Sequence, residues 1–201
     1  MELSPIAKEK LSKIGKLTEE EMSRLKYSEI LKSMLTKYFT NKLNPDALWE
    51  ELRKHKAAGR EYLLGEAQVR LLDTMSISSN ERDFERVSRG VLAVESLKDN
   101  GDYASLEQSL KSINDLSRRY KEEKEEAYDR IKTAVEKQVG MAVQQLANQA
   151  AANGAMVDIK GSVEASVRNS PDWKRFITRH DATYNQKFKD HIRKIRVMLK
   201  G

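Results

Sequence analysis

Residues 102–153 read DYASLEQSLKSINDLSRRYKEEKEEAYDRIKTAVEKQVGMAVQQLANQAAAN, and this stretch decides the fold. It contains no proline, and Gly140 is its only glycine. Asp102 is suited to cap a helix, and Asn153-Gly154 is suited to end one. The stretch predicts one very long helix, or two helices on one axis, and an unbroken helix of about 50 residues would be roughly 75 Å long. Apolar residues recur in steps of three and four, which places one stripe on one side of a helix: Leu106, Leu110, Ile113, Leu116, Tyr120, Ala127, Ile131, Val135, Val139, Ala142 and Leu146.

The two halves of this helix differ in polarity. Residues 118–126 are almost all charged, with Lys124 at a position where the stripe calls for an apolar side chain. Residues 138–157 carry no charged side chain and consist mainly of alanine, glutamine, asparagine and other small or apolar residues. Their amides exclude a membrane span, because amides are costly in hydrocarbon. The uncharged segment is either a buried seam within the monomer or a surface for self-association.

Helix start signals recur along the rest of the chain. A polar cap followed by proline occurs at Ser4-Pro5, Asn44-Pro45 and Ser170-Pro171, and Thr18 with Glu21 has the pattern of a capping box. Residues 76–80 read as a linker, residues 156–159 as a short extended piece, and residues 162–169 as one or two helical turns. We therefore predict an all-α, elongated antiparallel helical bundle with coiled-coil-like packing. Residues 1–75 would form an N-terminal unit and residues 80–201 a long-helix unit, or both would form a single domain.

Composition limits the class of protein further. The chain has 201 residues, of which 34% are charged and 39% hydrophobic, and it has no cysteine. Disulfides, thiolate metal sites and thiol catalysis are thereby excluded. The sequence after Met1 lacks a basic region followed by an apolar run, and no apolar window is long enough to span a bilayer. We expect a cytoplasmic protein that does not enter a membrane.

Catalytic and cofactor motifs are missing from the sequence. The glycines form neither a phosphate-binding loop nor a dinucleotide fingerprint, and no nucleophile elbow is present. His180 and His191 are eleven residues apart, roughly 16 Å along a helix, which is too far for one metal ion. We expect the histidines, His55 included, to pack among aromatic rings or to lie partly exposed. No catalytic residue, cofactor or metal is predicted, although a pocket with converging carboxylates would revive an enzymatic function.

The last predicted helix holds the excess charge of the chain. Residues 171–201 contain nine lysines or arginines against three aspartates, a net charge of +6 that equals that of the whole chain. This asymmetry makes the helix a candidate for contact with an anionic partner. Three interpretations of the helix are open: foremost a structural helix with a solvated basic face, then a helix that docks on an acidic protein surface, and then a helix that binds nucleic acid. The candidate contact residues are Lys174, Arg175, Arg179, Lys187, Lys189, Arg193, Lys194 and Arg196.

Two functions follow as expectations. The first is a non-enzymatic interaction or assembly protein, a scaffold or adaptor, that binds a protein partner or forms a homodimer. The second is a nucleic-acid-associated protein in which the basic helix neutralises phosphates. In that case Trp173, Tyr184 or Phe188 could stack on bases if exposed, but their helical spacing favours a place in the core.

Overall fold

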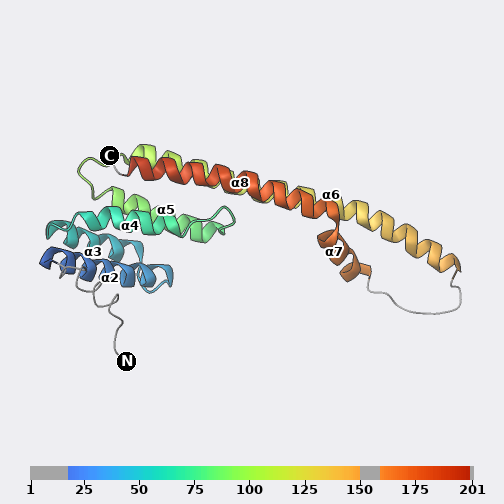
Figure 1. Ribbon diagram of the computed structural model, residues 1–201, viewed down its shortest axis with the longest axis horizontal. Coiled ribbons are helices and arrows are strands. Elements are labelled where there is room, and N and C mark those ends of the chain that lie inside the picture. Colours follow the sequence, from blue (N-terminus) through green and yellow to red (C-terminus); the bar gives the residue numbers. More distant parts are fainter. Residues whose placement is uncertain (1–17, 150–158, 200–201) are drawn as a thin grey trace, which may run out of the picture. The chain divides into compact units, whose positions relative to one another are not determined.

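The computed structural model describes residues 18–149 and 159–199, without the side chains of residues 142–149 and 159–162. The described residues form seven helices and no strand, which confirms the all-α prediction (Figure 1). The helix expected after Ser4-Pro5 lies outside the described residues. The helices are α2 (Glu19–Phe39), α3 (Pro45–Ala57), α4 (Tyr62–Asp73), α5 (Glu81–Glu95), α6 (Tyr103–Gln149), α7 (Ile159–Asn169) and α8 (Pro171–Met198).

Three of the predicted helix starts have the expected geometry. The Thr18 hydroxyl accepts a hydrogen bond from the Glu21 amide at 3.2 Å, and the Glu21 carboxylate accepts one from the Thr18 amide at 2.8 Å. Asn44 Oδ1 accepts from the Ala47 amide at 2.7 Å, and Ser170 Oγ accepts from the Trp173 amide at 3.1 Å. Each cap satisfies an amide at the start of its helix that has no partner within the helix.

The long helix is continuous over the residues that the structure describes. α6 contains 47 residues, from Tyr103 to Gln149, and the last four residues of the predicted stretch lie outside the description. The prediction of an extended piece is wrong at Ile159, because α7 begins there and includes Gly161. A glycine within a helix costs about 1 kcal/mol, which the burial of Val163 and Val167 on the same helix can offset.

The chain divides into two compact units. Residues 1–71 and 89–101 form the first unit, and residues 72–88 and 102–201 form the second. The sequence-based boundary between residues 75 and 80 stays a prediction. The helices of each unit pack on one another in the manner of a bundle.

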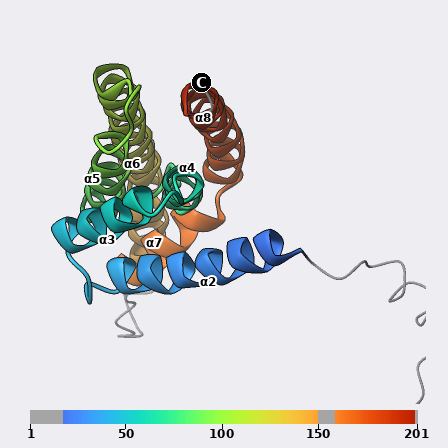
Figure 2. The ribbon, with the colours of Figure 1, turned by 90° about the vertical axis from the view of Figure 1, so that its left-hand side faces the viewer.

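The first unit is built on α2, α3, α4 and the second half of α5. α2 and α3 lie next to each other (Figure 2). Tyr38 of α2, which is 1% exposed, lies beside Gly90 of α5. Buried Gln68 of α4 donates to the Glu95 carboxylate at 2.6 Å, and Lys98 forms an ion pair with the same carboxylate at 3.1 Å. This buried polar contact links α4 to the end of α5.

The second unit is organised along α6. α8 runs antiparallel to α6, since Met198 lies against Ser109 near one end of the pair and Trp173 lies against Tyr128 toward the other. Figure 1 shows the two helices side by side over most of α8. α7 also packs on α6. The segment before α5 joins the unit through a buried hydrogen bond of 2.8 Å from Ser117 Oγ of α6 to the Ile77 carbonyl.

Candidate functional site

A stack of aromatic rings and one imidazole lies between α6 and α8. The side chains on α8 follow helical spacing, which places them on the face toward α6. Tyr120 of α6 stacks on His180 with ring centroids 5.0 Å apart, and Phe176 stacks on the same imidazole at 4.9 Å. Tyr184 lies 4.6 Å from the imidazole, and Trp173 extends the stack beyond Phe176 at 5.7 Å. His180 therefore packs among aromatic rings, as the sequence predicted.

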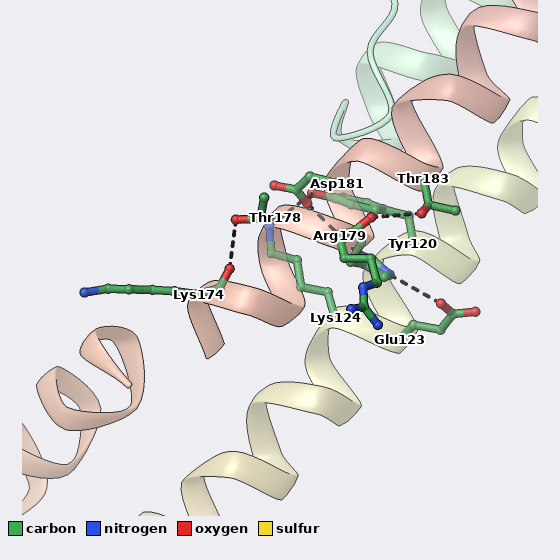
Figure 3. Close-up of polar contacts among 9 residues, drawn as sticks. Tyr120, Glu123, Lys124, Lys174, Thr178, Arg179, Asp181 and Thr183 are labelled. Carbon is green, nitrogen blue, oxygen red and sulfur yellow. Dashed lines mark hydrogen bonds and ion pairs between the residues drawn. The ribbon is translucent and has the colours of Figure 1, made fainter. Parts of the chain in front are cut away.

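A chain of hydrogen bonds crosses from α6 to α8 at the stack (Figure 3). Lys124 Nζ donates to the Tyr120 hydroxyl at 3.1 Å, and that hydroxyl donates to Asp181 Oδ1 at 2.9 Å. The lysine that interrupts the apolar stripe of α6 thus supports the tyrosine at the helix interface. Because hydrogen bonds to charged groups are stronger than neutral ones, this chain fixes the register between the two helices.

His180 is a buried polar side chain without an aligned hydrogen bond. Only 7% of its surface is exposed, and neither ring nitrogen has a hydrogen-bond partner among the described residues. Nε2 lies 3.3 Å from Glu123 Oε2, which is ion-pair distance but not hydrogen-bond geometry. Burial raises the pKa of the neighbouring Tyr184 to about 12, and a hydrogen bond to Glu123 adds to this rise. Buried polar groups normally have hydrogen-bond partners, so the imidazole is an exception that needs an explanation.

A groove of about 560 Å³ runs over this imidazole. Its walls are residues of α8 between Asp172 and Lys187 together with Glu123 of α6. The lining is mostly apolar, with the guanidinium groups of Arg175 and Arg179 on the α8 side. Figure 3 labels Arg179 of α8 and Glu123 of α6, which both line the groove. The volume is within the range of small-molecule sites.

All eight candidate contact residues on α8 are exposed, and we call them the cationic face of α8. Three of them have acidic partners: Arg175 with Asp172 at 2.6 Å, Arg193 with Asp190 at 3.4 Å, and Arg196 with Asp73. The other five have no carboxylate within ion-pair distance in the part of the chain that the structure describes: Lys174, Arg179, Lys187, Lys189 and Lys194. The helix therefore presents more positive charge than the neighbouring acids neutralise.

Tyr184 and Phe188, two of the three rings considered for base stacking, are too buried to stack on a nucleic-acid base. Tyr184 is 5% exposed and Phe188 is 8% exposed. Trp173 is half-buried between Phe176 and Tyr128. The expectation that helical spacing places these rings in the core is confirmed for Tyr184 and Phe188, whereas Trp173 is only half-buried.

The described residues contain no group of three or more histidines, cysteines or acids able to hold a metal ion. Two carboxylates do line the groove, but they do not act together, since Asp172 is bound to Arg175 and Glu123 to Tyr184. In the same part of the chain, no helix has the length and apolarity needed to cross a bilayer.

Sequence reasoning missed the groove and the state of His180. The spacing of Phe176, His180 and Tyr184 correctly indicated a buried stripe, but it could not show which side chain of α6 would face the imidazole. The one available signal was a histidine on an otherwise aromatic stripe, with Asp181 beside it.

The chain belongs to a family of unknown function, DUF6657, whose family model matches residues 49–201. The matched segment includes the groove and the cationic face of α8. No curated protein and no solved structure matches the chain.

Proposed function

We propose that this protein is a non-enzymatic helical interaction protein that docks an acidic protein surface on the cationic face of α8. The observation that carries the proposal is the exposure of five cations on α8 without carboxylate partners among the described residues. Unpaired surface cations contribute little to folding, since even paired ones are worth about 0–1 kcal/mol. Their charge is therefore available for steering and orienting a partner of opposite charge.

The arrangement of the cations supports docking along the helix axis. Lys189, which has no carboxylate partner among the described residues, lies in one row with Arg193 and Arg196, which pair with Asp190 and Asp73. The buried stripe that includes Phe188, Ile192 and Ile195 occupies the side toward the protein interior. Packing on α6 holds α8 in place, so the cations are presented on a rigid element rather than on a loop.

Assembly through α6 is a second part of the proposal. Ile131, Val135 and Val139 are only half-buried, and Met141 is 59% exposed. This partly uncovered stripe continues in sequence into the uncharged residues 138–157. A second copy of the chain, aligned along the same stripe in a coiled-coil-like manner, would cover these side chains and form a homodimer.

Nucleic-acid binding is the alternative function for the same cations. Lysine and arginine would neutralise phosphates, and the affinity would fall steeply with salt. The burial of Tyr184 and Phe188 weighs against this alternative, because base stacking needs exposed rings. An acidic protein surface needs no such rings, and for that reason we favour it.

The test uses the tagged full-length chain, recovered from its own cells after nuclease treatment. We expect a protein to be recovered with it in a fixed ratio at about 0.15 M salt, where surface charges still interact over a Debye length near 8 Å. The triple substitution Lys189→Glu, Arg193→Glu and Lys194→Glu should remove that protein. The control changes three exposed lysines of the first unit by the same total charge: Lys26→Glu, Lys32→Glu and Lys42→Glu.

Three results would contradict the proposal. One is a recovered partner that the α8 variant and the control variant retain equally well. Another is recovery of nucleic acid in place of protein, which would favour the alternative. The third is the absence of any macromolecule that depends on the α8 cations.

A further inference from the structure

The groove over His180 shares Arg175, Arg179 and Lys187 with the cationic face of α8, but its buried imidazole and its aromatic wall have no part in the proposed docking of a protein. We propose that it binds a small molecule with a flat apolar body and one oxyanion group, a carboxylate or a phosphate.

The imidazole of His180 lacks aligned hydrogen bonds. His180 lines the groove and is 7% exposed, yet neither of its nitrogens has a hydrogen-bond partner among the described residues, although Nε2 lies 3.3 Å from Glu123 Oε2. A neutral imidazole donates one hydrogen bond and accepts another. Leaving such a group unpaired in the interior costs free energy, and because both nitrogens are themselves buried, a ligand relieves this penalty only where it displaces the Glu123 carboxylate, which lies 3.3 Å from Nε2.

The walls of the groove carry two cations that no carboxylate of the described residues neutralises. The Asp172 carboxylate is bound to Arg175 at 2.6 Å, and Glu123 accepts a hydrogen bond from the Tyr184 hydroxyl. Arg179 and Lys187 are the two groove cations without a carboxylate partner in the described part of the chain. A guanidinium matches the planar, two-oxygen geometry of a carboxylate or a phosphate, so Arg179 is the residue assigned to the oxyanion.

The lining of the groove is mostly apolar. Phe176 and Tyr184 line the groove and contact the ring of His180, and Phe176, which is half-buried, offers more surface to a ligand than Tyr184, which is 5% exposed. A volume of about 560 Å³ holds a bicyclic ring system as well as its anionic group. A free phosphate or a single acetate would leave most of that apolar surface wet, which is why the apolar body belongs to the ligand.

The test is a titration of the full-length protein, labelled with ¹⁵N in its histidine rings, with 2-naphthoate and with phenyl phosphate. These two probes separate a carboxylate from a phosphate as the anionic group. 2-Naphthamide serves as the uncharged match for naphthoate. His55 and His191 do not line the groove and act as internal controls in the same spectrum. His180→Phe, which retains a ring in the stack, assigns the signal.

We expect at least one of the anionic probes to shift the His180 signal saturably, with the other two histidines unmoved. Arg179→Gln should weaken this binding roughly tenfold or more, as expected for the loss of a charge-assisted pair. Lys194→Gln is the matched control, since it removes an exposed α8 cation that does not line the groove. Because salt screens distant charges, it should change the affinity for the anionic probe by no more than about twofold.

The proposal is overturned if neither anionic probe shifts His180 saturably. It is also overturned if 2-naphthamide binds as tightly as 2-naphthoate, or if Lys194→Gln weakens binding as much as Arg179→Gln does. Because Lys189, Arg193 and Lys194 carry the test of protein docking, failure of one proposal leaves the other intact.

Discussion

Gly90 of α5 is held close to the side chains of Tyr38 and Leu71 in the first unit. A Cβ atom at this position would lie 3.2 Å from Leu71 Cδ1, 3.2 Å from the Tyr38 hydroxyl and 3.3 Å from Tyr38 Cε1. Tyr38 and Leu71 are 1% and 0% exposed, so neither side chain has free space to move into. The glycine is therefore needed for close packing at this point of the helix.

Gly90→Ala should destabilise the protein by about 1 kcal/mol. The alanine gains up to about 1 kcal/mol in helix propensity, but overpacking a filled core costs about 1–3 kcal/mol. Urea denaturation measures the difference. Gly65→Ala is the control, since a Cβ there meets nothing within 4 Å, and it should stabilise α4 by up to about 1 kcal/mol. An equal increase in the free energy of unfolding from Gly90→Ala and Gly65→Ala would refute the close contact at Gly90.

Tyr184 should ionise only near pH 12. Burial and the Glu123 carboxylate both disfavour the phenolate, and the folded pKa is therefore raised from 10.0 to about 12. The contribution of this group to stability is fully present below pH 10, where neither state ionises. It is lost as pH rises through 10 to 12, because the unfolded state then releases the proton first. Subtracting the ultraviolet titration of Tyr184→Phe from that of the wild type isolates the ionisation of the Tyr184 phenol. Ionisation near pH 10 would contradict the burial of this side chain.

At the scale of elements, the start of α8 depends on Ser170. Its hydroxyl accepts from the Trp173 amide at 3.1 Å and donates to the Val167 carbonyl at 2.8 Å, so it joins α7 to α8. Ser170→Ala should lower the free energy of unfolding by about 1 kcal/mol, the usual effect of losing a helix cap. Ser170→Thr retains both hydrogen bonds and should be close to the wild type. Chemical denaturation followed by circular dichroism checks this, and identical stability of Ser170→Ala would exclude a capping role.

Most of the helices could be predicted because their signals are local. A cap such as Thr18 with Glu21 acts within one turn, and the stripe of α6 repeats every three or four residues. The helical turns predicted for residues 162–169 fall short of α7, because a glycine such as Gly161 favours a helix end locally, whereas the buried Val163 and Val167 stabilise the helix around it. Local preference decides a helix end only where tertiary packing does not favour a different end.

The candidate site could be predicted only in part, since it depends on two helices. The α8 cations are exposed as their spacing predicted, and His180 packs among aromatic rings. The groove and the unsatisfied imidazole arise from the register of α8 against α6, which is set by contacts such as Tyr120 with Asp181 across 61 positions of the chain. No periodicity within one helix encodes that register.

At the scale of the whole molecule, the partly uncovered stripe of α6 predicts self-association. Size exclusion coupled to light scattering should give a dimer for the wild type. The double substitution Ile131→Gln and Val135→Gln should give a monomer. It replaces apolar side chains at the proposed interface with amides, and burying an amide without hydrogen-bond partners costs free energy. A wild-type monomer at the highest soluble concentration would remove the homodimer from the proposal.

Docking of an acidic protein on α8 is tested most directly by photo-crosslinking in the cells that make this protein. A photoreactive amino acid replaces the exposed Asn185 of α8, and a control protein carries it at the exposed Glu20 of α2. The account predicts a protein adduct from position 185 that resists nuclease and disappears with Lys189→Glu, Arg193→Glu and Lys194→Glu. An adduct with nucleic acid, or an adduct pattern from position 185 no different from that at position 20, would contradict it.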